Sequence, residues 1–285
     1  MAIISTRPIN LIITTAERWK NSCLIEDKAL FKEGELWAPQ NINLFKNYFS
    51  DNLIEGNEDT FYEKLKIQLS ESPPEVKQLA AEMIYLILLF PRKIKAETKA
   101  RDVRLIWSWS GSNLDESFPD LDASFEEGVG STGMAYSSYR WAELVFFTTW
   151  LSSLKSLVIS ERERLLSDPW IFGNWLDKTE GADKRQFRHI VLFLLFPNTF
   201  ETCSSRNQKN QMISAFEEKI GSGSPLIVND DSEWIKKDKN ILLIREQLTE
   251  VAGESINFYL PPYKDMWMPT DKDKNELDDI DEEGK

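Results

Sequence analysis

The stretch that decides the fold is SPPEVKQLAAEMIYLILLFP, residues 72–91. It begins with Ser72, which can cap a helix, followed by two prolines suited to a first helical turn and an acid near the positive end of the helix dipole. The apolar residues that follow occupy every side of the helix until Pro91 ends it. A helix that is apolar on all sides has to lie inside a core, so the sequence predicts a buried helix here.

A second segment of this kind covers residues 187–196 and ends at Pro197. Both segments close with the same letters, Leu-Leu-Phe-Pro. Two buried helices suggest either two subcores or an old duplication, and so short a match leaves both interpretations open.

Helical periodicity extends over most of the remaining chain. Thr60 can cap a helix, because Glu63 follows in capping-box register. Further helices are expected at residues 15–31, at 41–49, at 135–159 as the longest helix, from Asp168-Pro169 to about 177, and at 241–251 before Gly253. Strand patterns are weak, with residues 225–228 as the convincing candidate and Ile3-Ile4 as a marginal one. The sequence therefore predicts an all-α, multi-helix globular domain with two buried apolar helices and little or no β-structure.

The expected organisation is a helical domain over residues 1–264, followed by an acidic disordered tail over residues 265–285. The domain can consist of two subdomains whose boundary lies near residues 110–134. The tail holds nine Asp and Glu residues against three Lys, and after Trp267 and Met268 it has almost nothing apolar to bury. Such a segment stays solvated.

Composition narrows the possible functions. With 34 Lys and Arg against 47 Asp and Glu, the net charge of −13 disfavours phosphate backbones and anionic lipid unless basic residues gather locally. Two Cys and one His exclude a Cys/His zinc site, which needs four ligands. The N-terminus lacks the features of a signal peptide, and no apolar run approaches the roughly 20 residues of a membrane span. We expect a cytoplasmic protein without membrane contact, metal or cofactor.

The run Gly128–Gly133 matches G-x-G-x-x-G, a nucleotide-binding pattern. No strand-like segment precedes it, and the lysine that a P-loop requires is absent. The favoured interpretation is a glycine-rich loop in which Ser131 or Thr132 caps the long helix.

Other patterns that resemble catalytic motifs have simpler interpretations. Glu-x-Lys, half of a nuclease core, occurs at 75–77, 97–99 and 217–219, each time in a helical context where such pairs are ordinary surface charges. The single histidine, His189, lies in an apolar segment and is expected to be partly buried and hydrogen-bonded locally. No catalytic residue is predicted.

A group of basic residues is the candidate nucleic-acid-binding site. Positive charge beside aromatic rings can hold a phosphate backbone and stack a base. The alternative, favoured by the net negative charge, is a solvated helix face whose tryptophans turn into the core. The candidate residues are Arg92, Lys93, Lys95, Lys99, Arg101 and Arg104.

Three tryptophans and an arginine are candidates for a pocket, namely Trp107, Trp109, Arg140 and Trp141. Glu143 follows Arg140 by three residues. The arginine therefore either lines a pocket or pairs with this acid on the helix surface.

Several phrases of the sequence together resemble the N-terminal region of McrB-like AAA+ NTPases, the motor subunits of modification-dependent restriction systems. The resemblance covers roughly residues 16–268. It is carried by GELW at 34–37, FYEKLKIQL at 61–69, PEVKQLAAE at 74–82, LLFP at 88–91, GVGS at 128–131, YRWAEL at 139–144, DPW at 168–170, RH at 188–189, LLFP at 194–197, NFY at 257–259, PP at 261–262 and Trp267.

The chain departs from that family in lacking G-x-x-x-x-G-K-[ST], a Walker-B-like acid pair and a motor-length segment after Trp267. The resemblance thus implies a non-catalytic sensor or adaptor domain of a prokaryotic restriction or anti-phage defence system, coupling recognition of a target or partner to an AAA+ NTPase. Modified DNA is a weaker second partner. The alternatives are a stand-alone carboxylate- and metal-dependent enzyme such as a nuclease, using acids such as Glu126 and Glu127, and a purely structural interaction scaffold.

Overall fold

The computed structural model of the protein describes residues 7–56, 58–114, 118 and 121–268. Over these residues the backbone is helical with no β-strand, and the extended pairings are two isolated bridges, Lys28 with Glu35 and Pro91 with Gly130. The prediction of an all-α fold is confirmed. The α-helices are α1 Arg7–Arg18, α2 Pro39–Phe45, α3 Phe61–Gln68, α4 Pro74–Leu89, α5 Ala96–Ser108, α6 Met134–Ser138, α7 Arg140–Lys155, α8 Ile159–Ser167, α9 Pro169–Leu176, α10 Phe187–Leu195, α11 Arg206–Ala215, α12 Glu217–Ile220, α13 Glu233–Ala252 and α14 Tyr263–Trp267.

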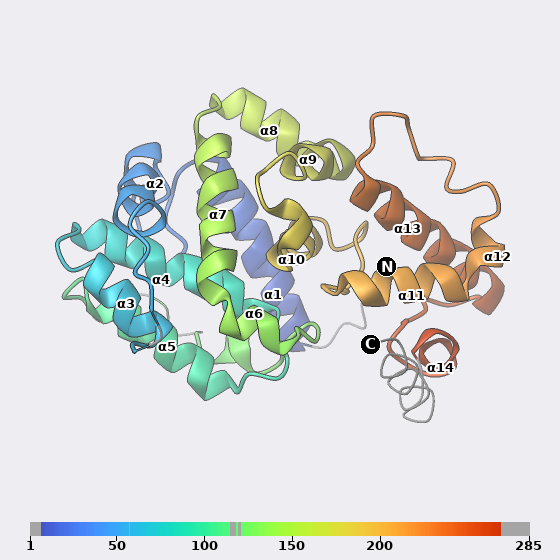
Figure 1. The fold of residues 1–285 in the computed structure, drawn as a ribbon, viewed down its shortest axis with the longest axis horizontal. Helices are drawn as coiled ribbons and strands as arrows, with labels where there is room; N and C mark the ends of the chain where they lie inside the picture. Colours follow the sequence, from blue (N-terminus) through green and yellow to red (C-terminus); the bar gives the residue numbers. More distant parts are fainter. Residues whose placement is uncertain (1–6, 57, 115–117, 119–120, 269–285) are drawn as a thin grey trace, which may run out of the picture.

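Short irregular helices complete the architecture. Two π-helical turns, Trp19–Ile25 and Lys46–Ser50, continue α1 and α2, and two 3₁₀ turns lie at Ala123–Phe125 and Ala182–Lys184. In Figure 1, α7 crosses the middle of the molecule, α2 to α5 lie on one side of it, and α11 to α14 form the opposite end. No described helix combines the length and the apolar composition needed to cross a bilayer.

The two apolar helices are buried as predicted. Every residue of α4 from Gln78 to Leu89 is buried, and so is every residue of α10. The start of α4 differs from the prediction, because Pro73 stands at the cap position and the Ser72 hydroxyl donates to the carbonyl of Leu69 instead. Pro73 and Pro74 therefore begin the helix, with Glu75 in its first turn, and Ser72 does not cap it.

Glu82, on the buried face of α4, anchors the loop that follows α1. Its carboxylate accepts the backbone N–H groups of Leu30 and Phe31, both at 2.9 Å, and the indole N–H of Trp37 at 2.5 Å. Burial raises the pKa of Glu82 to about 7, against the opposing effect of these three donors.

The hydrophobic core divides into two clusters near residues 200–203. The first holds residues between Ile12 and Phe200 together with Ile235 of α13, and it contains both apolar helices, so these helices do not mark separate subcores. The region 110–134, where the sequence places a subdomain boundary, contributes Leu114, Leu121, Phe125 and Val129 to this same cluster. The second cluster comprises Cys203, Met212, Phe216, Ile241, Ile244, Leu248, Ile256, Phe258 and Trp267.

The expected long helix at 135–159 is interrupted. Tyr139 has φ −106° and ψ 31°, which separates α6 from α7, and the chain leaves α7 at Lys155 before α8 begins. Gly133 takes the cap position of α6, so Ser131 and Thr132 do not cap it. Among the described helices the longest is α13, with 20 residues, which ends at Ala252 and is capped by Gly253 in a left-handed conformation.

Two further expectations are corrected. Residues 225–228 form a turn in place of a strand, held by the ammonium of Lys239, which donates to the carbonyl of Leu226 at 2.6 Å. Residues 265–268 belong to the fold, because the Trp267 indole is buried and donates to the carbonyl of Phe258 at 2.7 Å. Residues 269–285, the rest of the predicted tail, and Ile3-Ile4 lie outside the described residues.

Candidate functional site

A pocket of about 590 Å³ opens between the segment leading into α3 and the junction of α6 with α7. Four aromatic rings contribute to its lining, from Phe49, Phe61, Tyr139 and Trp141. Two carboxylates, Glu55 and Asp59, belong to the same lining. Phe49 is buried, whereas Tyr139 and Trp141 keep 55% and 43% of their surface exposed.

A second hollow of about 300 Å³ lies on the other side of Trp141. The face of α7 lines it with Val145 and Phe146, and the loop before α10 contributes Glu180 and Arg185. Trp141 lines both spaces. The two hollows therefore meet at this residue.

Arg140 holds the start of α7 in place without lining either hollow. Its guanidinium donates to the Tyr62 hydroxyl on α3, its central carbon lies 5.4 Å from the Tyr62 ring centre, and one nitrogen is 3.9 Å from Asp102 on α5. Burial raises the pKa of Tyr62. Because Arg140 reaches inward to α3 and α5, this anchor fixes the backbone from which the exposed rings of Tyr139 and Trp141 project.

The pairing of Arg140 with Glu143 on the helix surface, one of the two alternatives left open by the sequence, is not formed. Glu143 accepts the backbone N–H groups of Gln186 at 3.3 Å and Phe187 at 2.9 Å. These are free amides at the N-terminus of α10, where a carboxylate is favourable. Burial raises the pKa of this buried acid.

Trp107 and Trp109 do not belong to the pocket. Trp107 is buried in the first cluster, where its ring centre lies 5.8 Å from that of Phe31. Trp109 is half-buried and packs against the same cluster. Of the four predicted pocket residues, the structure places Trp141 in the lining and Arg140 behind it.

The six basic residues do not form one surface. Lys99 is fully buried, lies 5.4 Å from the Phe125 ring centre and finds no hydrogen-bond acceptor among the described residues, so it cannot contact a nucleic acid. Burial lowers its pKa to about 8. Arg101 pairs with Asp102 at 2.9 Å and Arg104 with Asp122.

The first three members of the group lie before α5 and are exposed. Arg92 donates to the carbonyls of Gly128 and Val129, at 3.4 and 3.2 Å, whereas Lys93 and Lys95 extend into solvent. Nucleic-acid binding by the five residues other than Lys99 stays a prediction.

The glycine-rich run has a packing role in the structure. A Cβ atom at Gly128 would lie 2.4 Å from the Arg92 backbone, and one at Gly130 would lie 2.7 Å from the Phe90 ring. The N–H groups of Val129 and Gly130 bond to the carbonyl of Phe90 at 2.9 and 3.1 Å. Glycine is needed here because two chain segments approach closely.

The acids considered for metal chemistry, Glu126 and Glu127, do not belong to a cluster of metal-binding side chains among the described residues. Glu126 and Glu127 are exposed, and the described part of the chain holds no group of three His, Cys, Asp or Glu residues arranged to bind a metal ion. The Glu-x-Lys pairs lie on α4, α5 and α12, which confirms their helical context.

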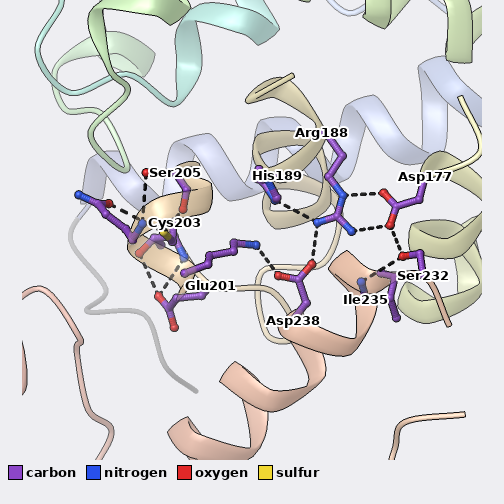
Figure 2. A network of polar contacts seen from close by, with 12 residues as sticks. Asp177, Arg188, His189, Glu201, Cys203, Ser205, Ser232, Ile235 and Asp238 are labelled. Atoms are coloured by element: carbon purple, nitrogen blue, oxygen red, sulfur yellow. Dashed lines mark hydrogen bonds and ion pairs between the residues drawn. The ribbon is translucent and has the colours of Figure 1, made fainter. Parts of the chain in front are cut away.

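His189 is hydrogen-bonded locally as predicted, but it is fully and not partly buried, and its surroundings form a network that the sequence does not indicate. His189 is buried and its Nδ1 accepts from the Arg188 guanidinium at 3.0 Å. Figure 2 shows Arg188 between two carboxylates, 2.7 and 2.9 Å from Asp177 and 2.6 Å from Asp238. Lys209 on α11 donates to the other oxygen of Asp238.

This network joins α10, in the first cluster, to α11 and α13, which pack around the second. Burial, Lys209 and Arg188 hold the pKa of His189 well below its usual range, so the ring is neutral. Burial alone would raise the pKa of Asp238, but Lys209 and Arg188 outweigh it and lower that pKa. Every member is paired and enclosed, as expected of a structural junction.

Comparison with family models, with curated proteins and with solved structures finds no match to this chain. The resemblance to McrB-like NTPases therefore rests on the sequence phrases quoted above.

Proposed function

We propose that this chain is a non-catalytic recognition domain of a prokaryotic defence system, working beside an AAA+ NTPase, and that it binds a protein partner through the two hollows flanking Trp141. The observation that carries the proposal is the pair of hollows that share one exposed tryptophan in their linings.

The exposed rings support partner binding. Tyr139, Trp141 and the neighbouring Leu53 and Ile54 present apolar surface to solvent around the pocket mouth. Tryptophan and tyrosine are the residues that contribute most at protein interfaces, because each buries a large rigid surface while keeping a polar group available. A partner that covers this surface gains the free energy of removing it from water.

The charge around the pocket favours a protein over a nucleic acid. Residues 51–63, which contribute six members of the pocket lining, include five acids and no basic residue in sequence. A phosphate backbone laid along this segment would be repelled, and the net charge of −13 adds to that repulsion. The AAA+ partner is taken from the sequence resemblance.

Co-purification tests the proposal. The tagged chain is expected to retain an AAA+ NTPase encoded beside it, and Trp141→Ala is expected to weaken that association roughly tenfold or more. Val251→Ala provides the matched control, because Val251 is 80% exposed on α13, away from both hollows. Failure to find any AAA+ partner, or an association that Trp141→Ala leaves unchanged, would refute the proposal.

A further inference from the structure

We infer that the pocket beside Trp141 receives a lysine or arginine side chain of the partner protein. This inference rests on the proposed function and specifies the chemistry that the pocket selects. It combines three observations: the aromatic rings of the lining, its two carboxylates, and the hydrogen bond that already holds the ammonium of Lys64.

The rings supply a surface suited to a cation. A positive charge within about 6 Å of the face of Trp, Tyr or Phe is attracted by the ring quadrupole, most strongly for Trp. The pocket lining includes the exposed Trp141 and Tyr139, the half-buried Phe61 and the buried Phe49. The same kind of contact occurs elsewhere in the chain, where the ammonium of Lys237 lies 4.5 Å from the Trp234 ring centre.

The carboxylates add charge complementarity. Glu55 and Asp59 line the pocket and are exposed, and the structure records no hydrogen bond or ion pair for either of them among the described residues. Lys64 is the basic residue of the lining, and its ammonium already donates to the carbonyl of Gly56. An incoming cation would thus meet two carboxylates that have no cationic partner within the described chain.

The dimensions favour a side chain carried by a peptide segment over a free ion. A pocket of about 590 Å³ accommodates a group of drug-like size. The adjoining hollow, with Val145 and Phe146, offers an apolar place for a neighbouring residue of the same segment. The expected occupant is therefore a basic residue next to an apolar one.

Short blocked peptides test this chemistry directly. Acetyl-Leu-Lys-Leu-amide and its neutral isostere with norleucine in the middle are titrated into the full chain by NMR. The lysine peptide is expected to bind roughly tenfold more tightly. The preference should shrink as salt is raised, since exposed charges are screened.

Variants locate the effect. Glu55→Gln with Asp59→Asn is expected to abolish the preference for lysine, and Trp141→Leu to weaken both peptides. Glu161→Gln with Glu163→Gln, on exposed positions of α8, is the matched control and should change neither. Equal thermal unfolding of all variants shows that folding is unaffected. Equal affinity for the two peptides, absence of peptide binding, or a preference that survives the carboxylate variants would overturn the inference.

The two proposals fail in different ways. If Trp141→Ala abolishes association with the AAA+ protein while the carboxylate variants do not, the cation inference fails and the proposed function stands. If the lysine preference is observed but no AAA+ protein associates, the proposed function fails. A single-stranded oligonucleotide that binds through Trp141, with no peptide binding, would overturn the inference in favour of a nucleic-acid site.

Discussion

Replacing Asp238 with alanine is expected to lower the free energy of unfolding by about 3–5 kcal/mol, the usual cost of removing one partner from a buried ion pair. Asp238 is buried and serves two cations at once, Arg188 at 2.6 Å and Lys209 through its second oxygen. The predicted loss of stability arises from the buried cations that lose a carboxylate partner, because the alanine side chain itself introduces no charge.

The two cations are affected unequally. Arg188 keeps two hydrogen bonds to Asp177, at 2.7 and 2.9 Å, so its charge stays compensated. Within the described part of the chain the Lys209 ammonium has no other hydrogen-bond or ion-pair partner, and its side chain is only 1% exposed. Most of the predicted loss is therefore the penalty of an unpaired buried ammonium.

Equilibrium unfolding in urea at pH 7 measures this loss, and a double-mutant cycle identifies its source. Adding Lys209→Met removes the uncompensated charge, so the double variant should be more stable than Asp238→Ala alone. A loss below about 1 kcal/mol, or a double variant whose destabilisation equals the sum of the two single ones, would refute this account.

Three other predictions concern single positions. The pKa of Glu82 is raised from 4.5 to about 7 in the folded protein, so protonated Glu82 stabilises the fold at low pH. This stabilisation is lost as pH rises from 4.5 through 7. Over that range the free energy of unfolding of the wild type, relative to Glu82→Gln, should therefore fall by about 3 kcal/mol. Urea titrations at several pH values measure this difference, and a pH-independent one contradicts it. Gly130→Ala should lower the free energy of unfolding by about 1–3 kcal/mol, because the new Cβ would lie 2.7 Å from the Phe90 ring. Gly133→Ala should lower it less, since the nearest atom to its Cβ is 3.8 Å away. Equal melting temperatures of the two variants would disprove this difference. Thr60→Ala removes the capping box of α3 and should cost about 1 kcal/mol by the same assay, so an unchanged stability would show that the cap contributes nothing.

Features that depend on neighbouring residues could be predicted from the sequence. The capping box of Thr60 and Glu63 is formed, and Asp168 caps α9 by accepting the N–H groups of Trp170 and Ile171. The buried helices ending in Leu-Leu-Phe-Pro are also correct, because continuous apolar composition has no stable alternative to burial.

Features that depend on residues far apart in the chain could not be predicted from the sequence. Tyr139 interrupts a continuous helical pattern where Arg140 is anchored to Tyr62, 78 residues earlier in the chain. Asp238 meets Arg188 across 50 positions, and neither shows its partner locally. The presence of Arg188 and His189 in an otherwise apolar helix was a signal that buried partners exist, but not which ones.

The candidate site was predicted in part for the same reason. The sequence indicates Trp141 as an aromatic residue beside an arginine, but it does not indicate the opposite wall with Glu55 and Asp59. That wall belongs to a connecting segment without periodicity, and only the fold brings it against α7. The exposed Leu53-Ile54 pair followed by several acids was the available indication.

The shared carboxylate of Asp238 also restricts how this protein can drift in evolution. Losing the acid first leaves the Lys209 ammonium buried without a partner, whereas losing Lys209 first leaves Asp238 still hydrogen-bonded to Arg188. Related proteins that carry apolar residues at this junction are therefore expected to have replaced Lys209 before Asp238. Reconstructed ancestral sequences would show that order of substitution.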